Sequence, residues 1–593
     1  MVVNRHLSGK QLHGASETGP ARSGETAVAV SQANSLADDF GSKPLYSLIA
    51  DTARTDPQRI CIHYGGRNLT YAEVDEASSR FASSLASLGV KKGDRVAIVL
   101  PNIPQFVISY FGIMKAGGIV VACSMLYKPK ELEYQLKDSG ASVIVTVNDV
   151  IAEKSLETGK AAKSYKDLFE NVQKCKDRLG IDNVITTSVT DYLPAIKRRL
   201  AGFAGVRKLP RPGTMDFCGL LRSGNAIKDP VAVDPSEDLA LLQYTGGTTG
   251  VSKGAMLTHL NLYSNAACVS SLFPMTKDDV SLCVLPLFHI YGMTVTMNSA
   301  LVAGAKLVLL PSFHVEEVMK AIQKQKVTLF CAVPAMYIAI NGNPNAKRFD
   351  LHSVRACLSG GAAMPSAVRK QFMDLTGASL VEGYGLTEAS PVALANPVQG
   401  GKAKDLSVGI PVTGTEVVIV DMEDPSKIMP AGEIGELAIR GPQVMKGYWN
   451  KNEETENVLR DGLLLTGDIA RMDEEGYFYI VDRKKDMVNV GGLKVYPRDV
   501  EEVLFGHPAV REAAVVAVPD SFSGEAVKAF VILNDPKAQV SEKELIDFCA
   551  TTLARYKVPK TIEFVDELPK TLIGKILRRE LRDQGDREHT ATS

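Results

Sequence analysis

A segment rich in glycine and hydroxyl side chains, residues 244–254, is the first candidate for chemistry in this sequence. Its eleven residues hold four glycines, four serine or threonine hydroxyls and one lysine, Lys253. Glycine lets the backbone turn tightly, so the N–H and O–H donors of such a loop can surround a phosphate group. Lys253 follows Ser252 and precedes Gly254, which excludes the Gly-Lys-Ser/Thr loop of P-loop enzymes. The segment therefore predicts a phosphate-binding loop of another kind.

A second glycine-rich segment, residues 381–390, combines an aromatic ring, Tyr384, with a carboxylate, Glu388. Its spacing is similar to the dinucleotide fingerprint GxGxxG, but Glu388 stands where the third glycine should be. The dinucleotide interpretation is therefore excluded. Taken alone, an aromatic residue and a glutamate among glycines are typical of a turn beside the core.

Four shorter motifs complete the set, at residues 286–292, 359–362, 466–468 and 567–579. Each by itself is typical of an ordinary feature, such as a core histidine, a β-turn or a solvated lysine near a C-terminus. Their order and spacing along one chain are much more specific than any single motif.

Together these motifs resemble the signatures of the adenylate-forming superfamily, which includes acyl-CoA ligases, firefly luciferase and the adenylation domains of peptide synthetases. The resemblance extends from about residue 44 to residue 583 and is closest to bacterial long-chain fatty acyl-CoA ligases. The phrases that carry the closer resemblance lie at residues 448–451, 481–487, 495–497 and 574–581. One departure is Gly-Gly-Leu-Lys at residues 491–494, where that branch usually has Ser-Gly-Phe-Asn.

The resemblance implies roles for individual residues of the nucleotide site. Tyr384 would stack on adenine, Thr387 would contact the α-phosphate, and Glu388 would hold Mg²⁺ together with Thr245. Asp468 and Arg483 would bind the ribose. The residues implied for cofactor binding are Thr245, Gly246, Gly247, Thr248, Thr249, Gly250, Lys253, Gly360, Gly361, Ala362, Glu382, Gly383, Tyr384, Gly385, Asp468, Arg483, Lys485, Gly491 and Gly492.

The resemblance also implies catalysis in two conformations. Lys575 would bridge the attacking carboxylate and the α-phosphate, supplying positive charge where the transition state becomes negative. No general base is needed, because a carboxylic acid is already ionised at neutral pH. The small domain would then rotate about Lys485 and bring residues 490–494 to a pantetheine tunnel. His289 would gate the acyl pocket, so the catalytic set is Lys575, Glu388, Thr387 and His289.

The implied function is ATP-dependent ligation of a medium- to long-chain fatty acid to coenzyme A, with ATP, Mg²⁺ and coenzyme A as cofactors. An alternative keeps the adenylation but changes the acid to an aryl acid such as 4-coumarate, or the acceptor to a carrier protein. An alternative of another class is a catalytically silent acyl or nucleotide binder, which should have lost Lys575 or Glu388. A P-loop ATPase or kinase would need the missing Walker run.

The elements that must position these residues alternate between short β-rich runs, such as residues 95–100, 143–146 and 327–330, and helix-length amphipathic stretches, such as residues 71–88. This rhythm predicts an α/β fold: a large body of mostly parallel sheets sandwiched by helices, with a small β-barrel-like subdomain, followed by a small mobile α+β domain. The predicted units are a disordered leader at 1–43, an adenylation domain at 44–482 with a variable insertion at 149–237, a C-terminal domain at 483–585 and a tail at 586–593.

Composition limits the partners. The 67 basic and 68 acidic residues give a net charge of -1, which offers no basic footprint for nucleic acid. The nine cysteines include no CxxC pair, which favours a reducing cytoplasm over a disulfide framework or structural zinc. Residues 197–211 are basic, without an acidic residue, and predict peripheral contact with the inner face of a membrane. Dimers occur in the resembled branch, so a homodimer is compatible with this sequence.

Overall fold

The computed structural model of the chain describes residues 43–151, 159–203, 206–208, 212–245, 252–520, 522–535, 538–570 and 576–582. The predicted leader up to residue 42, residues 246–251 of the predicted phosphate loop and Lys575 lie outside these ranges. Among the described residues, no helix is both long and apolar enough to cross a membrane.

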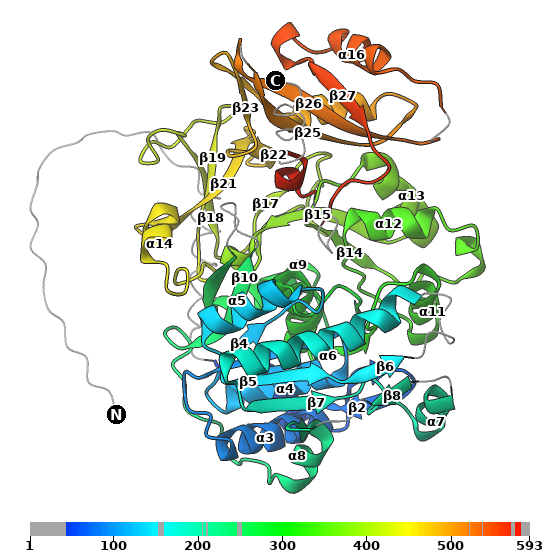
Figure 1. The fold of residues 1–593 in the computed structure, drawn as a ribbon, viewed down its shortest axis with the longest axis vertical. Helices are drawn as coiled ribbons and strands as arrows, with labels where there is room; N and C mark the ends of the chain where they lie inside the picture. The colour runs from blue at the N-terminus through cyan, green and yellow to red at the C-terminus, as the bar shows by residue number, and fades with distance from the viewer. Residues whose placement is uncertain are drawn as a thin grey trace, which may run out of the picture.

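The N-terminal part of the body is built on a seven-stranded sheet in the order β11-β10-β4-β3-β5-β7-β9 (Figure 1). The strands from β10 to β9 are parallel, and β11 joins β10 as an antiparallel edge. Most of their residues are buried, as expected for parallel strands that are covered on both faces. The strands are β3 (Arg95–Val99), β4 (Ile119–Ala122), β5 (Val143–Val147), β7 (Asn183–Thr187), β9 (Met215–Asp216), β10 (Leu239–Thr245) and β11 (Lys253–Thr258).

The helices between these strands cover both faces of the sheet. The connections are α4 (Pro104–Lys115) from β3 to β4, α5 (Pro129–Ser139) from β4 to β5, and α6 (Gly159–Leu179) between β5 and β7. Because β4 and β5 flank β3 on opposite sides, right-handed crossovers place α4 on one face and α5 with α6 on the other. Consistent with this arrangement, α5 packs on α6, and α4 packs on α3 (Tyr71–Ser87).

The segment predicted as a variable insertion, residues 149–237, contributes to the main sheet through β7 and β9. Val184 and Ile185 of β7 are fully buried, and Phe217 of α8 (Phe217–Ser223) packs against Phe81. Two short strands, β6 (Asp149–Ile151) and β8 (Val206–Lys208), pair at its periphery next to α7 (Ala195–Phe203). Part of this segment therefore belongs to the core.

A second sheet completes the body. Its parallel strands β12, β13 and β1 continue through isolated bridges of Leu329, to Ser281 and Ala356, into β14 and β15. The prediction of a regular strand at residues 327–330 is wrong. The preceding helix, α11 (Val315–Gln325), is capped by Lys326, and the chain after it forms only isolated bridges. The strands are β1 (Ile60–Tyr64), β2 (Arg67–Thr70), β12 (Val280–Cys283), β13 (Lys306–Leu309), β14 (Ala356–Ser359), β15 (Ser379–Gly385), β16 (Val392–Ala395) and β17 (Ile410–Pro411). The helices of this region are α2 (Ser47–Thr55), α9 (His259–Leu272), α10 (Ser299–Val302), α11 (Val315–Gln325), α12 (Pro334–Asn341) and α13 (Ser366–Thr376).

The body ends in an antiparallel five-stranded sheet, which is the predicted small β subdomain. Its last strand, β22, pairs with β21 and leads directly into the C-terminal domain, drawn in orange and red in Figure 1. The elements are β18 (Glu416–Val420), β19 (Ile434–Arg440), α14 (Asn452–Val458), β20 (Leu459–Arg460), β21 (Leu463–Met472) and β22 (Phe478–Arg483).

The C-terminal domain is a five-stranded sheet on which α15 (Pro497–Phe505) and α16 (Glu542–Ala550) pack. It has hydrophobic clusters of its own, in which Val500 and Leu504 pack with Leu545. The elements are β23 (Val488–Val490), β24 (Leu493–Val495), α15 (Pro497–Phe505), β25 (Val510–Asp520), β26 (Gly524–Leu533), α16 (Glu542–Ala550) and β27 (Thr561–Phe564). This α+β unit is a separate domain, as the sequence predicts.

Candidate active site

The predicted phosphate loop joins the antiparallel strands β10 and β11 of the main sheet. Thr245 and Lys253 are paired residues where these strands end, and the Ser252 hydroxyl donates a hydrogen bond of 2.6 Å to the Thr245 carbonyl oxygen. The loop is therefore held at both ends on the main sheet. The predicted residues between them, Gly246, Gly247, Thr248, Thr249 and Gly250, lie outside the described residues.

Glu388 lies close to the end of this hairpin, on the short 3₁₀ turn Thr387–Ala389. The Tyr448 hydroxyl donates a hydrogen bond of 2.7 Å to Glu388 Oε1, and Lys253 Nζ lies 5.0 Å from the centre of the Tyr448 ring. Burial, followed by the negative charge of Glu388, raises the pKa of the Tyr448 hydroxyl, which therefore stays protonated as a donor. Tyr448 thus connects the lysine of the loop to the predicted metal ligand.

Tyr384, on β15, contacts the residues predicted to bind the ribose. Its hydroxyl is hydrogen-bonded to Asp468, and Asp468 Oδ1 lies 3.0 Å from Arg483 Nε. Asp468 and Arg483 are paired residues on β21 and β22. Only 5% of the Asp468 side chain is exposed, so its charge is compensated by the Arg483 guanidinium rather than by water.

The packing around β14 and β15 leaves no room for side chains at two of the predicted glycines. A Cβ at Gly385 would lie 2.1 Å from the Pro391 carbonyl oxygen, and one at Gly383 would lie 2.9 Å from Leu358 Cδ1. Next to them, Glu382 Oε2 accepts a hydrogen bond of 3.1 Å from the Met364 N–H, and burial raises the pKa of Glu382. Glu382 is 8% exposed, and its hydrogen bond to Met364 stabilises the turn after β14.

The predicted acyl-gate histidine is joined to the predicted adenine turn by one tyrosine. The Tyr291 N–H donates to His289 Nδ1 over 3.2 Å, and the Tyr291 hydroxyl donates to the Leu358 carbonyl oxygen over 2.8 Å. The Tyr291 ring also lies against Gly360, where a Cβ would be 3.3 Å from Cζ. Gly361 has a φ of +83°, which favours glycine, and Ala362 follows in the same turn.

His289 lies three residues before a buried π-helix, Gly292–Asn298. Wider helical turns of this kind are frequent at functional sites. The Gln243 side chain on β10 donates a hydrogen bond of 3.1 Å to the Phe288 carbonyl oxygen, which links the strand before the phosphate loop to the His289 segment. The described residues of the predicted nucleotide site and acyl gate thus belong to one contiguous set of packed elements.

Comparison with known families assigns the body and the C-terminal domain. Residues 49–449 match the model of the AMP-binding enzyme family, and residues 499–575 match that of the AMP-binding enzyme C-terminal domain. The chain belongs to the AMP-binding enzyme family.

Individual relatives of this AMP-binding enzyme match it over most of their length. A long-chain-fatty-acid–CoA ligase of Bacillus subtilis (strain 168) is 43% identical over 557 residues, which cover 92% of this chain and 96% of the relative. A long-chain-fatty-acid–CoA ligase of Escherichia coli O157:H7 is 41% identical, over 88% of this chain and 90% of the relative. The crystal structure of ATP-bound MatB from Rhodopseudomonas palustris superposes with a TM-score of 0.78 at 28% identity, covering 92% of this chain and 99% of MatB.

The C-terminal domain of this AMP-binding enzyme carries the residues predicted for the second conformation. Gly491 and Gly492 are the two-residue turn of the β23–β24 hairpin, with φ angles of +58° and +90°. A turn with positive φ at both positions favours glycine at each. Lys485, the predicted hinge residue, is exposed in the link between β22 and β23. Gly491 and Gly492 therefore lie on the domain that would have to move, whereas Lys485 lies two residues after Arg483 of the predicted ribose site.

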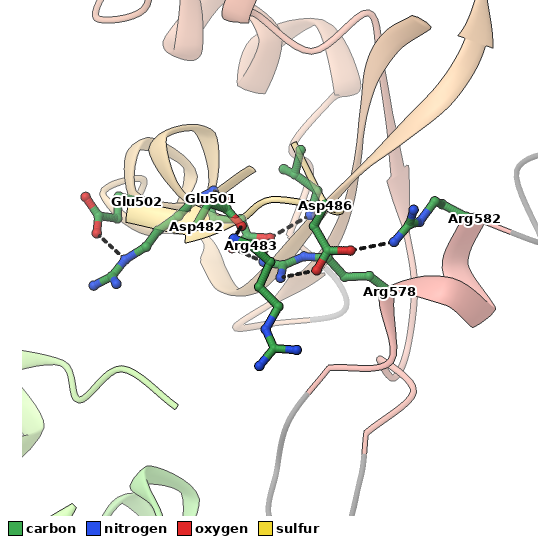
Figure 2. Close-up of polar contacts among 9 residues, drawn as sticks. Asp482, Arg483, Asp486, Glu501, Glu502, Arg578 and Arg582 are labelled. Atoms are coloured by element: carbon green, nitrogen blue, oxygen red, sulfur yellow. Dashed lines mark hydrogen bonds and ion pairs between the residues drawn. The ribbon is translucent and has the colours of Figure 1, made fainter. Parts of the chain in front are cut away.

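A network of buried charges surrounds the link between the two domains (Figure 2). Asp486 lies 3.6 Å from Arg578 and is also paired with Arg582, while Glu501 on α15 lies 2.8 Å from Arg578. The two carboxylates are 6% and 9% exposed, so both guanidinium groups of the C-terminal segment compensate charges that water does not reach.

Sequence reasoning identified neither this network nor the role of Tyr448. Tyr448, Asp486 and Arg578 lie in phrases that carry the family resemblance, at residues 448–451, 481–487 and 574–581. That resemblance was the available signal, but it does not state which of the residues contact one another.

Asp482 of β22 leads to a prediction about pH. Its carboxylate accepts hydrogen bonds from the Arg483 and Arg498 N–H groups, yet burial raises its pKa to about 6. The folded state therefore binds more protons than the unfolded state between about pH 4 and 6, and stability falls as pH rises through that window. The effect is at most about 3 kcal/mol. We therefore compare the melting temperature of Asp482→Asn with that of the wild type by differential scanning calorimetry. We expect the difference, variant minus wild type, to be more positive at pH 7.5 than at pH 4.5.

The matched control is Asp421→Asn. Backbone N–H groups, that of Asp424 first, lower the pKa of Asp421, so its carboxyl stays ionised in both states over most of this range. Its melting temperature relative to the wild type should stay nearly constant above pH 5. An equal trend for both variants would show that the Asp482 carboxyl is not the group that titrates.

Proposed function

We propose that this chain is an ATP-dependent ligase that activates a medium- to long-chain fatty acid as its acyl-adenylate and transfers the acyl group to coenzyme A. The products are an acyl-CoA, AMP and pyrophosphate. The observation that carries the proposal is the 43% identity to the Bacillus subtilis long-chain-fatty-acid–CoA ligase over 92% of this chain. The grouping of Thr245, Lys253, Glu388, Tyr384 and Asp468 in one body gives it a physical basis.

In the proposed first step, the body holds ATP and the fatty acid. Tyr384 and the turn at Gly360, Gly361 and Ala362 would flank adenine, and Asp468 with Arg483 would hold the ribose. The loop donors and Lys253 would orient the triphosphate. Since the acid enters as a carboxylate, these residues need only position the nucleophile and stabilise developing charge.

The proposed Mg²⁺ fits the oxygen groups at this site. Among the described residues, no group of three or more His, Cys, Asp or Glu side chains could hold a metal ion by itself. Glu388 and the Thr245 hydroxyl would therefore share the ion with phosphate oxygens, as Mg²⁺ sites in nucleotide enzymes commonly do. When bound, Mg²⁺ neutralises charge on the triphosphate, and Thr387 would donate to the α-phosphate.

In the proposed second step, the C-terminal domain (residues 483–585) rotates relative to the adenylation domain (residues 44–482). Lys485 would absorb the change in backbone angles, as residues at element termini do in hinges. Gly491 and Gly492 would then line the path of pantetheine, and His289 would move between the two half-reactions. Because the hydrophobic clusters of the C-terminal domain are its own, it can rotate without losing its core.

A substrate panel tests this proposal. Purified protein with ATP, Mg²⁺ and coenzyme A should release pyrophosphate with straight-chain acids and give the highest kcat/KM in the medium- to long-chain range. The panel should run from acetate to oleate and include benzoate and 4-coumarate, with coenzyme A compared with a phosphopantetheinyl carrier protein as acceptor. A maximum on aryl acids or on the carrier protein would replace the substrate or the acceptor. No pyrophosphate release with any acid would favour a silent binder.

The proposal places the enzyme in the cytoplasm, in peripheral contact with the inner face of the membrane. Long-chain acids partition into bilayers, so an enzyme near the surface meets its substrate at a higher local concentration.

A further inference from the structure

The helix α7 carries a row of exposed apolar side chains at the edge of the body. Ile196, Leu200 and Phe203 are 77%, 59% and 81% exposed. They are spaced at i, i+4 and i+7, which places all three on one side of an α-helix. Figure 1 shows α7 at the periphery of the molecule, beyond β6 and β8. The row is therefore an apolar stripe, which we call the α7 stripe.

Another side of α7 faces the protein. At the turn between β1 and β2, a Cβ at Gly66 would lie 3.3 Å from Lys197 Nζ, and one at Gly65 would meet the side chain of Leu193 just before the helix. Ala201 is half-buried, while every other residue of α7 is exposed. The α7 stripe thus points away from the body, because other residues of the helix and of the segment before it make the contacts with the body.

Three cations lie on the same helix. Lys197, Arg198 and Arg199 are exposed, and among the described residues none of them has a carboxylate partner. The chain has no acidic residue between Asp191 and Asp216. A surface that meets α7 therefore encounters apolar side chains and uncompensated positive charge together.

A protein partner is a weaker explanation than a bilayer. A helix of nine residues offers too little surface for a stable protein interface, which usually needs ~800 Å² from each partner. An anionic bilayer, in contrast, can take three apolar side chains into its acyl boundary and pair its headgroups with cations on the same helix. The side chains of lysine and arginine are long enough to reach such headgroups.

We propose that α7 is a membrane-docking helix, which inserts Ile196, Leu200 and Phe203 into an anionic leaflet while the positive charge of Lys197, Arg198 and Arg199 attracts its phosphate headgroups. The structure supplies the apolar component, which the basic composition of the segment did not reveal. The proposal rests on the proposed function only to explain why docking is useful, since docking would place the enzyme where its acyl substrate is dissolved. The binding itself does not depend on catalysis.

Cosedimentation of the full chain with vesicles tests the proposal. Wild-type protein should bind vesicles of equal parts phosphatidylcholine and phosphatidylglycerol, bind phosphatidylcholine alone weakly, and dissociate as salt increases. The variant Lys197→Gln/Arg198→Gln/Arg199→Gln should bind the anionic vesicles about 100-fold more weakly. The variant Ile196→Ser/Leu200→Ser/Phe203→Ser should lose at least about tenfold.

Matched controls lie elsewhere on the surface. Phe522 is 98% exposed on the C-terminal domain, so Phe522→Ser should not change binding. Lys347→Gln/Arg348→Gln removes another exposed basic pair and should have little effect. Because α7 contributes no buried side chain, both triple variants should keep the wild-type melting temperature and the wild-type rate of pyrophosphate release with a water-soluble acid.

Three outcomes would overturn the proposal. The wild type could fail to bind anionic vesicles, the triple variants could bind as the wild type does, or the controls could lose as much binding as the triple variants. A loss of self-association in the apolar variant, with vesicle binding unchanged, would instead assign the α7 stripe to a contact between copies of this chain. Failure of the fatty-acid assignment would appear in the substrate panel and would leave vesicle binding unaffected.

Discussion

Replacing Lys575 with alanine is expected to slow acyl-adenylate formation by roughly 10²- to 10³-fold. The transition state for adenylation gathers negative charge between the carboxylate and the α-phosphate, and Lys575 is the residue proposed to neutralise it. In the proposed two-conformation mechanism Lys575 is withdrawn before the second half-reaction, so thioesterification of a preformed acyl-adenylate should keep nearly its wild-type rate. Pyrophosphate exchange measures the first half-reaction, and a single turnover with synthetic acyl-adenylate and coenzyme A measures the second.

The control for Lys575→Ala is Lys570→Ala. Lys570 lies five residues earlier in the same segment, where it pairs with Glu512 in a partly exposed ion pair. Pairs of this kind contribute little to stability, about 0 to 1 kcal/mol. Both half-reactions should therefore survive in Lys570→Ala. An equal loss of both half-reactions in Lys575→Ala would contradict the two-conformation mechanism and indicate damage to the domain.

The periodic elements of this chain could be predicted from sequence because their determinants are local. The helix predicted from Tyr71 is α3, and its start is fixed by a capping box in which Thr70 and Glu73 bond each other's backbone. The prediction of a strand at residues 327–330 was wrong, because a β-rich composition does not reveal whether a segment is in register with its neighbouring strands. Leu329 pairs with Ser281 on one side and with Ala356 on the other, but each pairing is a single isolated bridge. Likewise, the polar composition of residues 149–237 concealed β7 and β9 in the main sheet.

The site is less predictable from sequence than the elements that hold it. Motif resemblance indicates Glu388 and Asp468 one at a time, but the hydrogen bond of Tyr448 to Glu388 joins residues 60 positions apart. Arg578 and Glu501 are separated by 77 positions. Such pairs depend on how whole elements pack, and no short window of sequence contains both partners.

The second large effect is expected from Arg578→Met. Arg578 compensates Glu501 and Asp486, whose side chains are only 9% and 6% exposed (Figure 2). Removing one partner from a buried pair leaves an uncompensated charge and costs about 3–5 kcal/mol. The lower end applies here, since Asp486 keeps Arg582 and Glu501 keeps the Val515 N–H. We expect the C-terminal domain to melt several degrees earlier in calorimetry, and residues 576–582 to lose protection in hydrogen exchange.

The same substitution should affect the two half-reactions unequally. Ile576 is the covalent neighbour of Lys575, and consecutive Cα atoms are only about 3.8 Å apart. A loosened segment at residues 576–582 therefore spreads Lys575 over more positions, and adenylation should fall by tenfold or more. In the proposed mechanism thioesterification does not use Lys575, so this half-reaction should change little at temperatures where the domain remains folded.

Two further variants separate lost charge compensation from lost packing. Arg582 is 32% exposed, and among the described residues Asp486 is its one carboxylate partner, so Arg582→Met should have a clearly smaller effect than Arg578→Met. In Arg578→Met/Glu501→Gln the buried charge is removed with its partner, while the amide oxygen can still accept from the Val515 N–H. Most of the lost stability should therefore return. If the double variant is as unstable as Arg578→Met, the arginine acts through its packing rather than through the charge that it compensates. If adenylation is unchanged in a destabilised Arg578→Met, the segment does not position Lys575.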